Sequence, residues 1–160
     1  MPVAVRHAAL RTRVCALFGV DLPIVQTGMG WVSGAALTAA TCEAGGLGIL
    51  AAVTMTSDEL HASIDRVKER TSNPFGVNLR ADQADVGERI DYALGHGVHV
   101  ISFAGAPTRQ LVDRIHEGGG VCVVTIGRRR HAEKMASWGV DALIAQGGEG
   151  GGHTGDIPTT

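Results

Sequence analysis

Short apolar runs alternate with amphipathic stretches along this chain. Runs of four to six mostly apolar residues are typical of strands that are buried in a parallel sheet. They lie at residues 23–26, 47–51, 75–79, 99–104, 121–126 and 142–147. Between them, apolar residues recur at helical spacing, as at Leu60, Ile64 and Val67. The pattern therefore predicts six strands joined by five helices, in the order β(αβ)5.

Residues at the expected helix ends support this assignment. The helical stretches lie around residues 33–46, 56–67, 86–94, 107–115 and 129–138. Thr56 and Glu59 form a T-x-x-E capping box at the start of the second helix. Pro107 suits the first turn of the fourth helix, where the missing N–H of a proline is not needed. Gly45 and Gly139 are expected to end the first and fifth helices.

Strands that are apolar on both faces indicate a parallel α/β sheet covered by helices. An open doubly wound sheet and a (β/α)8 barrel both fit this order of elements. In either fold, ligands bind the loops at the carboxyl ends of the strands. The unusual residues of this chain fall in those loops, at Gly28–Gly30, Asn78, Gly105, Thr125–Gly127 and residues 146–155. The loops at the opposite end, such as "EAGG", resemble plain helix terminators.

The stretch "QGGEGGGHTG" at residues 146–155 is the most unusual of these loops. A run of glycines makes sense where a ligand must approach the main chain or a turn needs positive φ. His153 in its middle is predicted to act as a general base or to orient a substrate, with a turn cap as the alternative. Glu149 either orients the His153 side chain or is solvated. Asn78 and Gln146 have amides that can bind a planar heterocycle, although Asn78 could instead form an Asx turn.

The amino-acid composition limits the classes of partner and the cellular compartment that we expect. The 14 Lys and Arg residues nearly balance the 16 Asp and Glu residues, which makes nucleic acid an unexpected partner. No apolar run approaches the ~20 residues of a membrane span. Three cysteines without paired spacing fit a reducing compartment, and we expect a cytoplasmic protein. The sequence also contains no H-x-x-x-H or C-x-x-C pair of the kind that binds metal ions. The basic run Arg128–Arg130 is either a solvated helix start or an anion contact.

Four stretches together resemble a known family. "PIVQTGMGWVSG", "EAGGLGIL", "NPFGVNLR" and "QGGEGGGHTG" follow one another in the order found in the nitronate monooxygenase (2-nitropropane dioxygenase-like) flavoproteins. The resemblance extends over residues 21–156 and includes the branch of FMN-dependent enoyl-acyl-carrier-protein reductases. It implies a (β/α)8 TIM barrel that binds FMN without a covalent bond, in a single domain over residues 1–160.

The resemblance also assigns roles to residues. It implies that Gly28, Met29 and Gly30 pass beside the flavin ring. Asn78, Thr125 and Gln146 would lie near the polar edge of the ring or the ribityl chain, and Gly151 and Gly152 would let the backbone close on the cofactor. His153 matches the active-site histidine of the family. The implied reaction is oxidation of a nitronate through the flavin.

Two alternatives to nitronate oxidation stay open. "TGMGWVSG" and "PFGVNLR" look closer to NAD(P)H-dependent reductases and to dehydrogenases of acyl or enoyl CoA thioesters. The other alternative is a non-catalytic barrel fragment that needs a partner, as a homo-oligomer or with a missing C-terminal half. Because a barrel of this kind takes roughly 250 residues, we expect these 160 residues to be truncated at the C-terminus and to bind FMN poorly alone.

Overall fold

The computed structural model describes residues 7–152, 158 and 159, and this part of the chain forms a sheet of six parallel strands. The strands are β1 (Val25–Gln26), β2 (Leu47–Ala51), β3 (Phe75–Leu79), β4 (Val100–Phe103), β5 (Val121–Ile126) and β6 (Ala142–Ala145). They lie side by side in sequence order. A doubly wound sheet would reverse its order at a switch point. The fold is therefore an incomplete (β/α)8 barrel, the one of the two expected architectures that the family resemblance implied.

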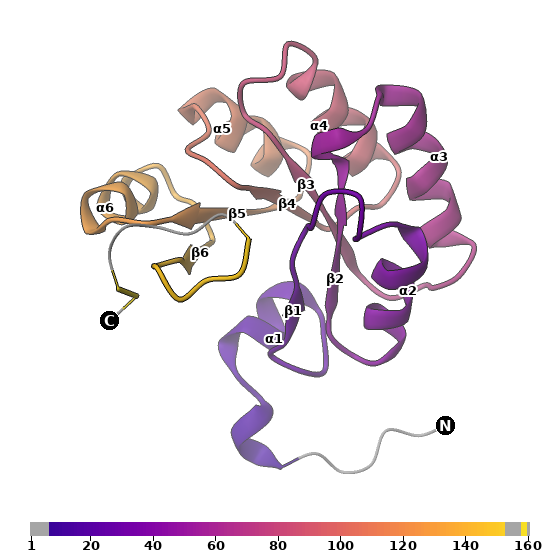
Figure 1. Ribbon diagram of the computed structural model, residues 1–160, viewed down its shortest axis with the longest axis horizontal. Helices are drawn as coiled ribbons and strands as arrows, with labels where there is room; N and C mark the ends of the chain where they lie inside the picture. Colours follow the sequence, from indigo (N-terminus) through magenta and orange to yellow (C-terminus); the bar gives the residue numbers. More distant parts are fainter. Residues whose placement is uncertain (1–6, 153–157, 160) are drawn as a thin grey trace.

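Helices cover the outer face of this sheet (Figure 1). They are α2 (Ala35–Glu43), α3 (Ser57–Lys68), α4 (Val86–Gly95), α5 (Arg109–Glu117) and α6 (Arg129–Ser137), with a short 3-10 turn at Ala52–Thr54. Their apolar stripes and the outward side chains of the strands form the main core, which includes Leu60, Ile64, Ile101 and Phe103. The predicted Thr56–Glu59 capping box is present at the start of α3. Burial of this core is the main source of stability.

The inner face of the sheet carries a second, smaller apolar cluster. Leu47, Ile49 and Val123 point inward and pack with Phe18. Phe18 ends α1 (Arg13–Phe18), a helix that follows a 3-10 turn at Ala8–Leu10 and that the hydrophobic pattern does not predict. Its C-cap Gly19 is left-handed, at φ 66°. Because Phe18 contacts residues at the strand starts, α1 closes the amino end of the half-barrel.

Three sequence expectations need correction. The burial on both faces holds throughout β2, β3 and β4, but β6 alternates between half-buried and exposed residues. An edge strand has a neighbour on one side only, so its residues cannot all be covered. The first strand is limited to Val25–Gln26. Pro107 precedes the N-cap of α5, because Thr108 accepts the hydrogen bond from the Leu111 N–H and Arg109 begins the helix.

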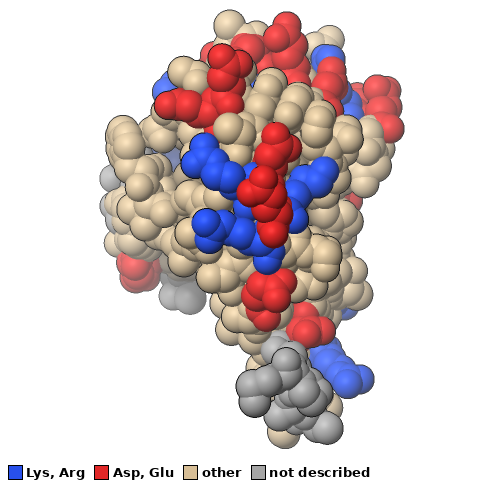
Figure 2. Space-filling view, turned by 90° about the vertical axis from the view of Figure 1, so that its right-hand side faces the viewer, with Lys and Arg blue, Asp and Glu red and all other residues tan. Residues whose placement is uncertain are grey.

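The outer surface over α3 mixes charges of both signs. Figure 2 shows acidic and basic side chains interspersed on this face. On α3 itself, Asp58 and Glu59 lie in the first turn and Arg66 and Lys68 in the last, which suits the helix dipole. This face thus carries no large field of one sign. Among the described residues, no helix is both long and apolar enough to span a membrane.

Candidate active site

An open cleft of ≈ 860 Å³ lies at the carboxyl ends of the strands. It is lined by every residue that the resemblance places near the flavin and that the structure describes: Gly28, Met29, Gly30, Asn78, Thr125, Gln146, Gly151 and Gly152. They come from four different strand ends and are brought together by the parallel sheet. His153 lies outside the described residues. The size of the cleft falls in the range of small-molecule and cofactor sites.

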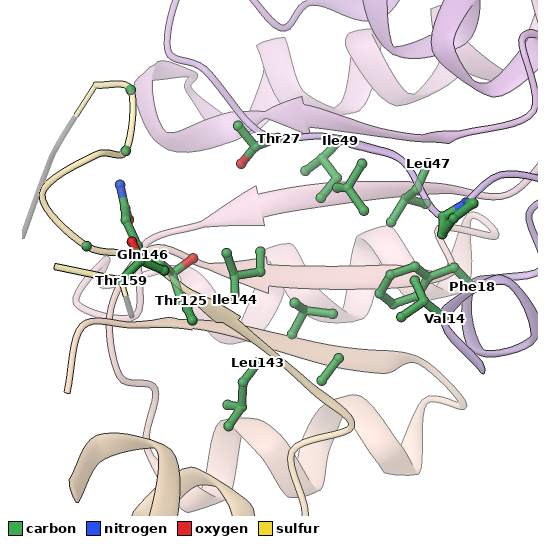
Figure 3. A pocket seen from close by; sticks show the side chains of 18 of the residues that line it. Val14, Phe18, Thr27, Leu47, Ile49, Thr125, Leu143, Ile144, Gln146 and Thr159 are labelled. Atoms are coloured by element: carbon green, nitrogen blue, oxygen red, sulfur yellow. The ribbon is translucent and has the colours of Figure 1, made fainter. Parts of the chain in front are cut away.

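Below this cleft, the inner face of the half-barrel changes from polar to apolar. Figure 3 shows Thr27, Thr125 and Gln146 at one end of a cavity of ≈ 670 Å³, and Leu47, Ile49 and Phe18 toward the other. Inward side chains alternate along each strand, so one row is polar and the rows beneath it are apolar. The polar row marks the layer where a ligand can be hydrogen-bonded.

Asn78 is the best-fixed polar group of this layer. It is 5% exposed, and its Nδ2 donates to the Oγ of Ser102 at 3.2 Å and to the Ser102 carbonyl at 3.3 Å. These bonds orient the Asn78 amide, and its Oδ1 lies on the side of Gly28. Ser102 was not predicted as a site residue. Its signal was available, since it is a polar residue inside the apolar run "HVISFA" and pairs with Asn78 across the sheet.

The first loop, Thr27–Gly34, is held from below by Ser33. Its buried hydroxyl donates to the Thr27 carbonyl at 3.0 Å and accepts from the Met29 N–H at 2.9 Å. The same hydroxyl accepts from Gln26 Nε2 at 2.9 Å, and Gln26 Nε2 also donates to the Ile49 carbonyl. One serine therefore ties both sides of the Gly28–Gly30 turn to strand β2. Sequence reasoning missed Ser33 and Gln26, because a polar side chain at a loop or at a strand end carries no local signal that distinguishes an anchor from a solvated group.

This anchoring coincides with backbone strain. Trp31 in the same loop has φ 60° and its side chain is 92% exposed. A bulky residue in the left-handed region is costly, on the order of 1–3 kcal/mol, and persists only where the surroundings fix it. The Ser33 hydrogen bonds supply that constraint. These hydrogen bonds thus fix the shape of the loop.

The glycine stretch after β6 has one clear anchor among its described residues. The Glu149 carboxylate accepts from the Thr159 N–H at 3.0 Å and from the Thr159 hydroxyl at 2.7 Å. The hydrogen bond from the Thr159 hydroxyl, above all, holds the pKa of Glu149 below its usual range. The carboxylate therefore links the glycine stretch to Thr159. Neither sequence-based alternative for Glu149 foresaw this partner.

Arg80, after β3, also lines the cleft but its charge is already compensated. Its Nε and Nη2 donate to the Asp82 carboxylate at 2.9 and 2.6 Å. This bidentate pair, above all its hydrogen bond, holds the pKa of Asp82 below its usual range. Arg80 is therefore a poor candidate for binding a free anion.

The sequence was also compared with protein-family models. The model of nitronate monooxygenase matches residues 11–95 and 87–160, which together make up most of the chain. The chain belongs to the nitronate monooxygenase family.

One relative is much more similar to this chain than family membership requires. The chain is 58% identical over 151 residues to (3aS,4S,5R,7aS)-5-hydroxy-7a-methyl-1-oxo-octahydro-1H-indene-4-carboxyl-CoA dehydrogenase of Mycobacterium tuberculosis. The match covers 94% of this chain and 42% of that protein. This chain therefore spans less than half the length of that relative.

Two solved structures share the fold of this member of the nitronate monooxygenase family. FabK from Thermotoga maritima has a TM-score of 0.87 and 32% identity, over 92% of this chain and 47% of its own. Nitroalkane oxidase from Streptomyces ansochromogenes has a TM-score of 0.78 and 34% identity, over 90% of this chain and 51% of its own. The six strands of this chain therefore correspond to about half of each larger protein.

Proposed function

We propose that this chain forms the ring-binding side of an FMN-dependent oxidoreductase that dehydrogenates a CoA thioester. The observation that carries the substrate class is the 58% identity, over 94% of the chain, to a protein named as a carboxyl-CoA dehydrogenase. That match spans 151 residues of this chain. The sequence had offered this activity as the alternative to nitronate oxidation, and it now has the stronger support.

The residues of the cleft fit a flat cofactor. A Cβ on Gly105 or Gly151 would meet no atom within 4 Å and would project into open space that a ring could fill. A Cβ on Gly28 would collide with Asn78, so this wall of the cleft has no room for a side chain. Loops after strands seven and eight usually bind the phosphate in such barrels. The described residues would therefore hold the ring side of FMN rather than its phosphate.

Asn78, Ser33 and His153 would have different tasks at the cleft. Bound FMN would supply a two-electron acceptor. The Asn78 Oδ1, fixed by Ser102, would accept a hydrogen bond from the polar edge of the ring. Ser33 would keep the Gly28–Gly30 turn flat against it. A ring nitrogen of His153 would take the proton that leaves the substrate, since an imidazole titrates near neutral pH.

Nitronate oxidation is the second candidate. The family model and the nitroalkane oxidase of Streptomyces ansochromogenes, at 34% identity, both favour it. The same histidine and the same flat cleft would serve a small carbanionic substrate. The two candidates differ in what must bind beyond the reacting carbon, because a nitronate has no phosphate-bearing arm.

Anaerobic mixing separates the candidates. The full chain, loaded with FMN, would be mixed with a hydroxyacyl-CoA thioester or with a small nitronate while the visible flavin absorbance is followed. We expect bleaching by the thioester, and slower bleaching in His153→Gln. His61→Gln is the matched control, because His61 lies on the outer helix α3 and does not line the cleft. Bleaching by the nitronate alone would favour the second candidate, and a flavin that neither compound bleaches would contradict both.

A further inference from the structure

A second cavity, of ≈ 440 Å³, adjoins the cleft on the side of α6. It is lined by residues 126–130, Ala145, Gln146, Pro158 and Thr159. Gln146 also lines the cleft, so the two spaces share a wall. Three consecutive arginines, Arg128, Arg129 and Arg130, line this cavity, whereas none of its described lining residues is acidic. We name it the arginine cavity.

The charges of the arginine cavity are poorly compensated. Arg129 Nε pairs with Glu133 at 2.7 Å, one turn along α6. Arg130 Nε donates to the neighbouring His131. The Arg128 carbonyl accepts from the His131 and Ala132 N–H groups, whereas no hydrogen bond or ion pair joins the Arg128 guanidinium to a described residue. A second carboxylate, that of Glu149, lies beside the cavity on its lining residue Thr159. Three arginines against these two carboxylates leave a net positive charge among the described residues. On the face over α3, by contrast, both signs are interspersed (Figure 2).

The backbone adds to this field. α6 begins at Arg129, its N-cap Arg128 provides no side-chain cap, and its first turn contains no acid. The first amides of a helix have no intrahelical acceptor, and the dipole makes this end positive. Arginine side chains together with such amides form strong, charge-assisted hydrogen bonds to phosphate oxygens. The site therefore combines both elements of phosphate recognition.

We propose that the arginine cavity binds the phosphate groups of the CoA moiety while the thioester reaches the cleft. This inference rests on the proposed function, because it assumes a CoA substrate. The arm of CoA joins the thioester to its phosphates, so a bound thioester must place those phosphates outside the cleft. The cavity across Gln146 is an adjacent surface with the required charge. Arg80 at the cleft itself is already paired with Asp82.

The test measures binding of CoA, pantetheine and FMN to the full chain by calorimetry, in wild type and in the double variant Arg128→Ala/Arg130→Ala. Both arginines are exposed, so circular dichroism should show an unchanged fold. We expect CoA affinity to fall about tenfold or more, since hydrogen bonds to charged groups contribute that much. Pantetheine and FMN affinities should stay the same, and the salt dependence of CoA binding should weaken in the variant.

Arg109→Ala is the matched control. Arg109 is an exposed arginine near the start of the neighbouring helix α5, paired with Asp113 at 3.6 Å, and it does not line the cavity. A loss of CoA affinity in this control as large as in the double variant would overturn the proposal, because it would reveal a general charge effect. A loss of FMN affinity in the double variant would assign the arginines to the cofactor phosphate and overturn it too.

CoA binding by wild type and by the double variant separates the arginine cavity from the thioester substrate. If wild type binds CoA and the double variant binds it equally well, only the arginine cavity is refuted. If wild type does not bind CoA at all, the thioester substrate itself is refuted, and the arginine cavity with it.

Discussion

Gly28→Ala is the sharpest single test of the cleft geometry. A Cβ at Gly28 would lie 2.5 Å from the Cβ of Asn78 and 3.0 Å from its Cγ. Non-bonded carbon atoms prefer a separation of about 3.5–4.0 Å. The loop or Asn78 must therefore move by about 1 Å. Asn78 is buried in β3 and bonded to Ser102, and Ser33 holds the loop, so neither side yields easily.

The expected magnitude follows from overpacking. Forcing a methyl group into a fixed contact typically costs about 1–3 kcal/mol of unfolding free energy. In a protein of this size, each kcal/mol lowers the melting temperature by roughly 2–4 °C. Gly28→Ala should therefore melt several degrees below wild type. The loop displacement should also weaken FMN binding, since Gly28 lines the cleft.

The assay is thermal unfolding of the full chain, followed by circular dichroism with Gly30→Ala as the control. A Cβ on Gly30 would touch only the Cγ2 of Thr54, at 3.4 Å, which is an ordinary contact. A compatible glycine-to-alanine change stabilises by about 0.4–1 kcal/mol through the unfolded chain. Equal melting temperatures for Gly28→Ala and Gly30→Ala would refute the close packing of Gly28 against Asn78.

Three further predictions concern the scaffold. Gly48→Ala should destabilise more than Gly28→Ala in urea unfolding, because its Cβ would lie 2.2 Å from the backbone oxygen of Thr38; a smaller loss would contradict this packing. The hydrogen bond from buried Arg89 holds the pKa of Asp85 below its usual range. That stabilisation is present above about pH 4 and is lost as pH falls through the lowered pKa. Asp85→Asn should thus be less stable near pH 7 and flatter in acid, and an unchanged pH slope would speak against the pair. Burial raises the pKa of Cys122 to about 12, so a thiol reagent should not label it near pH 8 until the protein unfolds; rapid native labelling would disprove its burial.

The sequence alone determined the order and type of the main elements. Apolar runs and helical stripes located β2 to β6 and α2 to α6, because periodicity records which faces are buried. It also predicted where the candidate site would lie, since the carboxyl ends of parallel strands meet at one edge of the sheet. Every described residue that the resemblance assigned to FMN lines that cleft. The local pattern did not locate α1, whose role depends on a distant contact of Phe18 with the sheet.

Only the tertiary structure decided how these residues act on one another. The sequence named Gly28 and Asn78 separately, but their contact arises from the curl of the sheet. Ser102 and Ser33 acquire their roles from hydrogen bonds to residues 24 and 6 positions away, respectively. β6 lost its expected burial because it lies at an edge, and the arginine cavity exists because α6 begins beside Gln146. Periodicity encodes burial along one segment, whereas contacts between segments depend on register and curvature, which no single segment contains.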